Sequence, residues 1–273
     1  FAAAMKFAEK VFATRSSNLD QFLVVICQYL RNDSPTHVKE IMKLLYSLSK
    51  KYPEQLYKAL NSIQSGPMLI QIDLIYLHQI INSSMLSNDL IIIHTLFISI
   101  LAELSRYKEF NDEVFVTPLC IDYIFSLVLE KGVDHPAPSI LRNIIRVTES
   151  EFFLKKCVEF VNIIEEKGVE YINAFMVVLE AFRCGMQSSN YYLINYFSSN
   201  KLACVFSKTV EKFTKYSPEK SLCFSMITMT LNVFMVFCQS SNNNLIYFAE
   251  CQDDFVQSFS YAISKIEVNE ALA

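Results

Sequence analysis

Glycine, proline, tryptophan and charge are all scarce in this chain of 273 residues. It holds 4 glycines, 7 prolines and no tryptophan, and charged residues make up 19% of it. Turns with positive φ need glycine, so this scarcity counts against sheets and against glycine-rich phosphate loops. No GxGxxG, GxxxxGK[ST] or HExxH motif occurs. We therefore expect no catalytic, cofactor-binding or metal-binding site and predict that the protein is not an enzyme.

The charge balance and the cysteines indicate the kind of partner and the cellular compartment. The net charge is −4, which disfavours nucleic acid as a partner because phosphate binding needs an excess of Lys and Arg. Eight cysteines occur without a CxxC pair, nearly all inside apolar patterns, as is typical of buried free thiols. We expect a reducing compartment, the cytosol or the nucleus. Because the chain begins at Phe1 rather than Met, we also expect it to be a fragment.

The composition is 52% hydrophobic, which predicts a large core of helices joined by short turns. Residues 221–249 contain no charged residue and raise the alternative of a membrane span. Polar residues such as Ser225, Thr230 and Asn232 interrupt this run, and no Trp anchors its ends. A helix buried in a large protein gives the same signal, and we favour that interpretation.

Proline, glycine and capping residues mark the expected helix ends. Helices are predicted over 35–52, from Pro53, 87–107, 118–131, 139–148, 150–167, 169–184, 188–198, 200–215, 218–239, 243–250 and 252–267. An interruption between helices is expected at Gly66-Pro67, and a loop is expected over 134–139. No convincing strand is found, since 113–117 is better explained as a helical turn.

An apolar frame recurs along these helices. Each copy of the frame is centred on an apolar residue, here called the anchor, with apolar residues three and four places before it. A polar stretch follows the anchor, and a new apolar run follows the polar stretch. The five anchors are Leu48, Leu104, Ile145, Phe182 and Phe237. Their separations of 56, 41, 37 and 55 residues lie around the roughly 40–47 residues of armadillo and HEAT units. Only the frame around Ile145 is imperfect, because Arg142 occupies an apolar position.

The segments "LLYSLSKKYPEQLYKAL" and "VVLEAFRCGMQSSNYYLI" carry a family likeness. They resemble armadillo repeats, in which the third helix ends in apolar-x-x-apolar before a short turn. The resemblance covers about 20–267 and implies an all-α, right-handed α-solenoid of about five irregular units. It also implies a single domain over 1–273, in which 1–19 could form a capping or partly ordered helix. The polar stretch 240–244 is then a joint between helices, whose side chains cap backbone groups.

The resemblance also implies where a partner would bind. In the armadillo members that import nuclear cargo, the groove helix carries Asn one place and Trp five places before the anchor. The corresponding residues are Lys43, Ser47, Ser99, Glu103, Ile140, Ile144, Val177, Ala181, Asn232 and Val236. The Asn and Trp ladder is absent. Either this groove binds an apolar helix or segment, or the protein's own helices fill it.

A histidine pair and an arginine pair could each be either a functional site or an ordinary structural feature. His78 and His94 could meet near Asp73 and mimic a metal site, but core or solvated histidines are favoured. Arg142 and Arg146 lie four apart on one predicted helix face and could hold an acidic peptide or a phosphate. A solvated surface is the favoured explanation of these two arginines.

The leading functional hypothesis is a non-catalytic protein-interaction scaffold or regulatory adaptor. A narrower hypothesis is a domain similar to the armadillo-like regulatory region of formins, which meets a small GTPase. An all-helical enzyme domain with a spatially assembled site and a membrane-associated helical protein are the competing hypotheses. The expected partner is another protein, and the sequence leaves the oligomeric state open.

Overall fold

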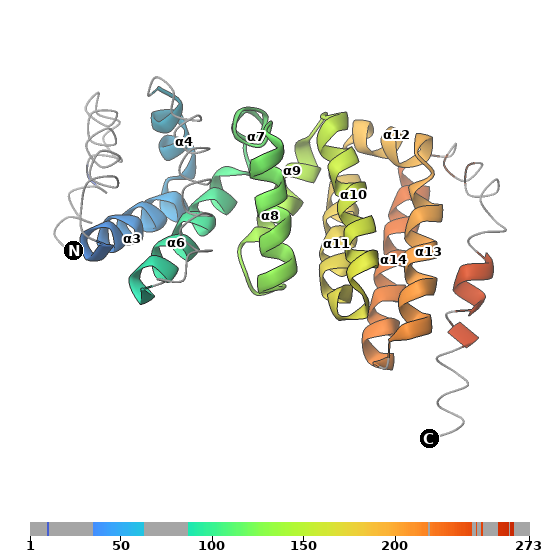
Figure 1. Cartoon of the computed structure of the whole chain (residues 1–273). Coiled ribbons are helices and arrows are strands. Elements are labelled where there is room, and N and C mark those ends of the chain that lie inside the picture. The colour runs from blue at the N-terminus through green and yellow to red at the C-terminus, as the bar shows by residue number, and fades with distance from the viewer. Residues whose placement is uncertain are drawn as a thin grey trace. The chain divides into compact units, whose positions relative to one another are not determined.

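The computed structural model describes Lys10, 35–62, 87–217, 219–241, Asn244, Tyr247, 256–261 and 263–264. Regular structure in these ranges is helical throughout, and no strand occurs in them. The chain divides into two compact units, Phe1–Ile124 and Phe125–Ala273, and the division falls inside α8 (Pro118–Lys131) (Figure 1). The all-α prediction is confirmed, while the single domain over 1–273 stays a prediction.

The first unit is helical from its first described segment. Its helices are α3 (Pro35–Lys51), α4 (Pro53–Ser62), α6 (Asn88–Leu104) and α7 (Lys108–Val114), followed by the start of α8. Proline opens α3, α4 and α8, where its missing N–H would have no helical partner. The hydroxyl of Ser87 caps α6 by accepting a hydrogen bond from the N–H of Leu90 at 3.3 Å. The predicted starts of α3, α4, α6 and α8 are confirmed, whereas a separate α7 was not predicted.

In the first unit, α3 packs along α6. Leu48 of α3 and Leu101 and Leu104 of α6 are buried. An ion pair between Lys39 Nζ and Asp89 Oδ1, 2.7 Å apart, joins the first half of α3 to the start of α6. This core is mainly aliphatic, and its helices are held together chiefly by apolar burial.

After α8 the second unit continues with a series of helices, and the described residues 256–261 near its end are helical too. The helices of the series are α9 (Ala137–Val147), α10 (Glu151–Lys167), α11 (Ile172–Gln187), α12 (Tyr191–Ser199), α13 (Leu202–Tyr216) and α14 (Lys220–Ser240). A 3-10 turn, η1 (Val169–Tyr171), precedes α11. Helix α11 packs between α9 and α14 in one layer, and α10 and α13 form a second layer against it (Figure 1).

Phenylalanine fills the space between these two layers. The rings of Phe175 and Phe182 on α11 meet Phe206 of α13 edge to face, with centroids 5.8 and 5.4 Å apart. Phe197 of α12 lies 4.8 Å from Phe237 of α14. All five side chains are fully buried. Edge-to-face pairs add to the free energy of plain burial, so this cluster is the main hydrophobic core of the unit.

Four of the five anchors lie in the last turn of a helix, Phe182 lies one turn earlier in α11, and all five are buried. Their helices are α3, α6, α9, α11 and α14, and no anchor exposes more than 1% of its surface. Within the units these helices pack in chain order, α3 on α6, then α9 on α11 and α11 on α14. The predicted burial of Leu48, Leu104, Phe182 and Phe237 is confirmed. Their position between repeat units stays a prediction.

Asparagine ties the helix ends to the joints that follow them. The side-chain amide of Asn111 donates to the carbonyl of Ser105 at 2.7 Å, and that of Asn244 donates to the carbonyl of Phe237 at 2.8 Å. The last carbonyls of a helix have no partner within it, and these amides supply one. Asn190 caps α12 and also donates to the carbonyls of Ile145 and Thr148, at the end of α9. The polar stretch at 240–244 is a structured joint at its described residues, as predicted.

Several predicted boundaries are wrong by a few residues. The helix predicted to reach Tyr107 ends at Leu104, and α7 follows it. The loop predicted over 134–139 is too long, because α9 begins at Ala137 with Pro138 in its first turn. The break at Gly66-Pro67 and most of the helices predicted over 243–250 and 252–267 lie outside the described residues.

Candidate protein-docking face

The sequence assigned a partner to ten positions, and the structure buries half of them. The buried five are Ile140, Ile144, Val177, Ala181 and Val236. The other five, Lys43, Ser47, Ser99, Glu103 and Asn232, are partly exposed. Buried side chains cannot present a binding surface, so the expectation that these five apolar positions line a groove is wrong. The protein's own helices fill that space.

Helix geometry explains the error. Residues one and five places before a buried anchor point sideways, about 100° and 140° from it, and α11 has a helix on each side. Places two, six and nine before the anchor lie about 160°, 120° and 180° from it, toward the other flank of the helix. On α14 these places hold Met235, Leu231 and Thr228, and all three are exposed. The outward strip is therefore displaced by one residue from the predicted one.

The outward strip of α14 is apolar. Phe224 is 62% exposed, Leu231 41% and Met235 51%, and Thr228 lies between them. Positions 224, 228, 231 and 235 follow the i, i+4, i+7, i+11 spacing of one helix face, about 16 Å long at 1.5 Å per residue. Contiguous apolar residues on a surface are typical of a binding interface.

Helices α9 and α11 expose arginine side chains, of which Arg146 is exposed and Arg142 and Arg183 are partly exposed. Arg183 forms a bidentate pair with Glu180, with both nitrogen–oxygen distances at 2.7 Å, and also donates to Gln187 at 2.9 Å. Arg146 reaches from α9 to the hydroxyl of Ser188 at 3.1 Å. The hydrogen bond from Arg183 is the main cause that lowers the pKa of Glu180, and the charge of Arg142 adds to it. Arg146 thus contacts the residue that follows α11, and the charge of Arg142 acts on Glu180 of α11.

We define the docking face by its seven charged and apolar side chains on α9, α11 and α14. They are Arg142, Arg146, Glu180, Arg183, Phe224, Leu231 and Met235. The sequence singled out the two arginines of α9 but missed the α14 strip. The signal was present in the uncharged run over 221–249, which was assigned to burial.

The thiol beside the arginine pair is a structural group. Cys184 donates to Glu180 Oε1 at 3.3 Å, and burial and this hydrogen bond raise the pKa of the thiol. The hydrogen bond from Arg183 lowers the pKa of Glu180 below its ordinary value of 4.5. A nucleophilic cysteine needs a lowered pKa, so this arrangement favours charge pairing over catalysis.

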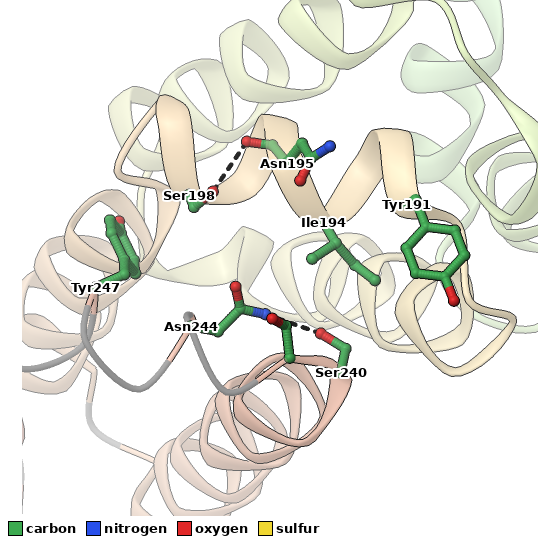
Figure 2. Close-up of a pocket in the computed structure, with 8 residues that line it drawn as sticks. Tyr191, Ile194, Asn195, Ser198, Ser240, Asn244 and Tyr247 are labelled. Atoms are coloured by element: carbon green, nitrogen blue, oxygen red, sulfur yellow. Dashed lines mark hydrogen bonds between the residues drawn. The ribbon is translucent and has the colours of Figure 1, made fainter.

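A polar pocket of about 350 Å³ lies beside the joint that follows α14. Figure 2 shows Tyr191, Asn195 and Ser198 of α12 on one side and Ser240 and Asn244 on the other. Its remaining lining residues are Ile194, Ser241 and Tyr247. The amide of Asn244 donates to Ser240 Oγ at 2.9 Å and so holds the joint side of the pocket. The lining offers hydroxyl and carboxamide groups for hydrogen bonding, since all eight of its residues are Tyr, Ile, Asn or Ser.

His94, a candidate metal ligand in the sequence, has a structural partner. It is buried and shares a hydrogen bond with the hydroxyl of Tyr123, so its interpretation as a core histidine is confirmed. His78 and Asp73 lie outside the described residues. Among the residues that the structure describes, no three His, Cys, Asp or Glu side chains cluster as metal ligands would.

Within the described chain, α14 is the one helix long and apolar enough to cross a membrane. Only 39% of its most apolar window is buried inside the protein, so core packing alone does not account for its composition. A comparison with known proteins finds no matching family model, no similar curated protein and no similar solved structure.

Proposed function

We propose that the chain is a non-catalytic protein-interaction scaffold of armadillo-like helical repeats. The repeat frame supports this proposal, because its five anchors are buried near the ends of helices that pack in chain order within each unit. Helical units of this kind cannot bury their apolar faces alone, and stacking them gives a right-handed solenoid with extended binding surfaces. The buried thiols Cys120, Cys157 and Cys223 accord with a reducing compartment, the cytosol or the nucleus.

The exposed apolar strip of α14 carries the proposal. The inner side of this helix already buries Val233, Phe234 and Phe237, so the fold does not need a second apolar side. Exposing Phe224, Leu231 and Met235 to water is unfavourable unless another molecule covers them. A protein partner docking on this strip provides that cover.

Site-specific photo-crosslinking tests the proposal. A photoreactive amino acid at Thr228, inside the strip, is expected to trap a protein partner in extracts of the source organism. The same amino acid at Asn162 of α10, which is also exposed, is the control. Leu231→Asp should abolish the crosslink from Thr228, and Ile163→Asp should leave it, since the two side chains have similar exposure of 41% and 44%. A crosslink that survives Leu231→Asp places the partner elsewhere and refutes the proposal.

A further inference from the structure

We propose that the docking face binds an amphipathic α-helix that carries acidic residues beside its apolar strip. This inference rests on the proposed scaffold function and specifies the chemistry of its partner. The partner's apolar side chains contact α14, and its carboxylates contact the arginines of α9.

The layer that bears the docking face is basic, although the protein is acidic. Helices α9, α11 and α14 together contain four basic residues, Arg142, Arg146, Arg183 and Lys220, and one acidic residue, Glu180. The whole chain has a net charge of −4. An electropositive face on an acidic protein favours a negatively charged partner, because complementary potentials speed association and exclude wrong partners.

The arginines are not equally available to a partner. Glu180 already pairs with Arg183 through two hydrogen bonds. Arg146 uses one nitrogen, Nε, on Ser188 and retains the other end of its guanidinium. Arg142 forms no hydrogen bond or ion pair with the residues that the structure describes. Guanidinium groups bind carboxylates through paired N–H donors, so Arg142 and Arg146 are the groups that the acidic side chains contact.

The spacing of the face fits a helix. Packed helix axes lie 8–10 Å apart, so the strips of α9 and α14 are separated by roughly 16–20 Å, with α11 between them. A helix with its side chains is about 10–12 Å wide and could lie over α11 in contact with both strips. The backbone N–H and C=O groups of an extended peptide would need hydrogen-bond partners such as side-chain amides, and the apolar strip offers none. A helix forms these hydrogen bonds within its own backbone.

An anionic membrane is the competing ligand for an apolar strip beside basic residues. Lipid headgroup binding of this kind uses clusters of about 4–8 Lys and Arg, whereas this face offers two arginines without a carboxylate. The net charge of −4 also repels an anionic surface. These charges favour the acidic helix.

A phage-displayed library of helical 18-residue peptides, selected on the full chain, tests the inference. We expect enriched peptides to combine apolar residues at i, i+4 and i+7 with a net negative charge. The double variant Arg142→Glu with Arg146→Glu should weaken their binding by about tenfold, as expected for reversal of two surface charges. Lys155→Glu on α10 is the matched control, because Lys155 is exposed and lies outside the face, and it should leave the Kd unchanged.

The possible outcomes separate the inference from the proposed function. Enriched peptides that are neutral or basic, or that bind the double arginine variant equally well, overturn the acidic helix. If such peptides still lose binding with Leu231→Asp, the docking face itself stands. Binding that is insensitive to Leu231→Asp, or an absence of enrichment, overturns both. Co-sedimentation with phosphatidylserine vesicles that is lost in Leu231→Asp would assign the face to a membrane instead.

Discussion

Helices α9 and α14 flank the same helix, α11, yet they present opposite chemistry to solvent. Helix α9 buries Ile140, Leu141 and Ile144 and exposes Arg146. Helix α14 buries an equally apolar inner side and exposes Phe224 and further apolar residues. Burial within the fold explains where the apolar residues of α9 lie, whereas on α14 it explains only the apolar residues of the inner side. The exposed apolar residues on the outer side of α14 are therefore the feature that the proposed partner would explain.

The largest effect should separate the two sides of α14 directly. Phe237→Ala removes a fully buried ring, and we expect it to lower the free energy of unfolding by about 3–5 kcal/mol. Phe224→Ala on the same helix should change it by less than about 0.5 kcal/mol, because Phe224 is 62% exposed. Urea unfolding followed by circular dichroism measures both. Equal losses would contradict the distinction between the inner and outer sides.

Loss of the Asn190 side chain comes next. Asn190→Ala leaves the carbonyls of Ile145 and Thr148 without their donor and uncaps α12. We expect a loss of roughly 2 kcal/mol, since a cap contributes about 1 kcal/mol and an unsatisfied buried carbonyl costs at least that. Chemical denaturation measures the change. Asn195→Ala, on the exposed side of α12, is the control, and a similar loss there would argue against the bridging role.

Gly185 sharpens the account of how α11 meets its neighbours. A Cβ at this position would lie 2.5 Å from Leu193 Cδ2 and 3.0 Å from the carbonyl oxygen of Ile145. Gly185→Ala gains about 1 kcal/mol of helix propensity, but overpacking costs about 1–3 kcal/mol. We therefore expect a net loss of up to about 2 kcal/mol in a thermal or urea melt. A stabilised variant would show that α9 and α12 separate easily from α11.

A smaller effect should come from the charged strip of α11 and depend on pH. The hydrogen bond from Arg183 lowers the pKa of Glu180 in the folded protein. The pair therefore contributes stability above the unfolded value of about 4.5, and this contribution is lost as pH falls through the lower folded pKa. Glu180→Gln should cost about 0.2–1 kcal/mol at pH 7 and nothing well below pH 4. Melting temperatures of both proteins measured from pH 7 to below pH 4 test this pH dependence, and Glu166→Gln is the exposed control.

The smallest expected effect is the most informative about the α14 strip. Leu231→Asp and its control Ile163→Asp should each change the free energy of unfolding by less than about 0.5 kcal/mol, because both side chains are over 40% exposed. Circular dichroism should show unchanged helix content. A large loss from Leu231→Asp alone would mean that this strip is covered by the protein itself and would end the comparison with α9.

The helices and their anchors could be predicted from the sequence because the relevant signals are local. Pro53, Ser87 and Gly132 mark helix ends through the φ values and capping bonds available to them, and the structure places helix boundaries at each. The anchors at Phe182 and Phe237 follow from apolar periodicity alone. These features need no knowledge of which helices are neighbours.

The outward face could not be predicted in the same way. The burial of Ile144 and Val177 depends on α11 having a helix on each side, and periodicity does not reveal the number of neighbours. For the same reason, the uncharged run of α14 could not be divided into an inner and an outer side. A register error of one residue, about 100° on a helix, was enough to move the predicted site from solvent to the core.

The asparagine at the start of α12 also bears on local unfolding in the second unit, because it bonds to several helix ends. Asn190 joins the end of α9 to the start of α12, 45 residues apart in sequence for its bond to Ile145. Its backbone N–H also donates to the carbonyl of Gly185, near the end of α11. Amide hydrogens at these three helix ends should therefore exchange with solvent at a common opening free energy. Through its side chain and its backbone N–H, this one residue thereby connects three helix ends.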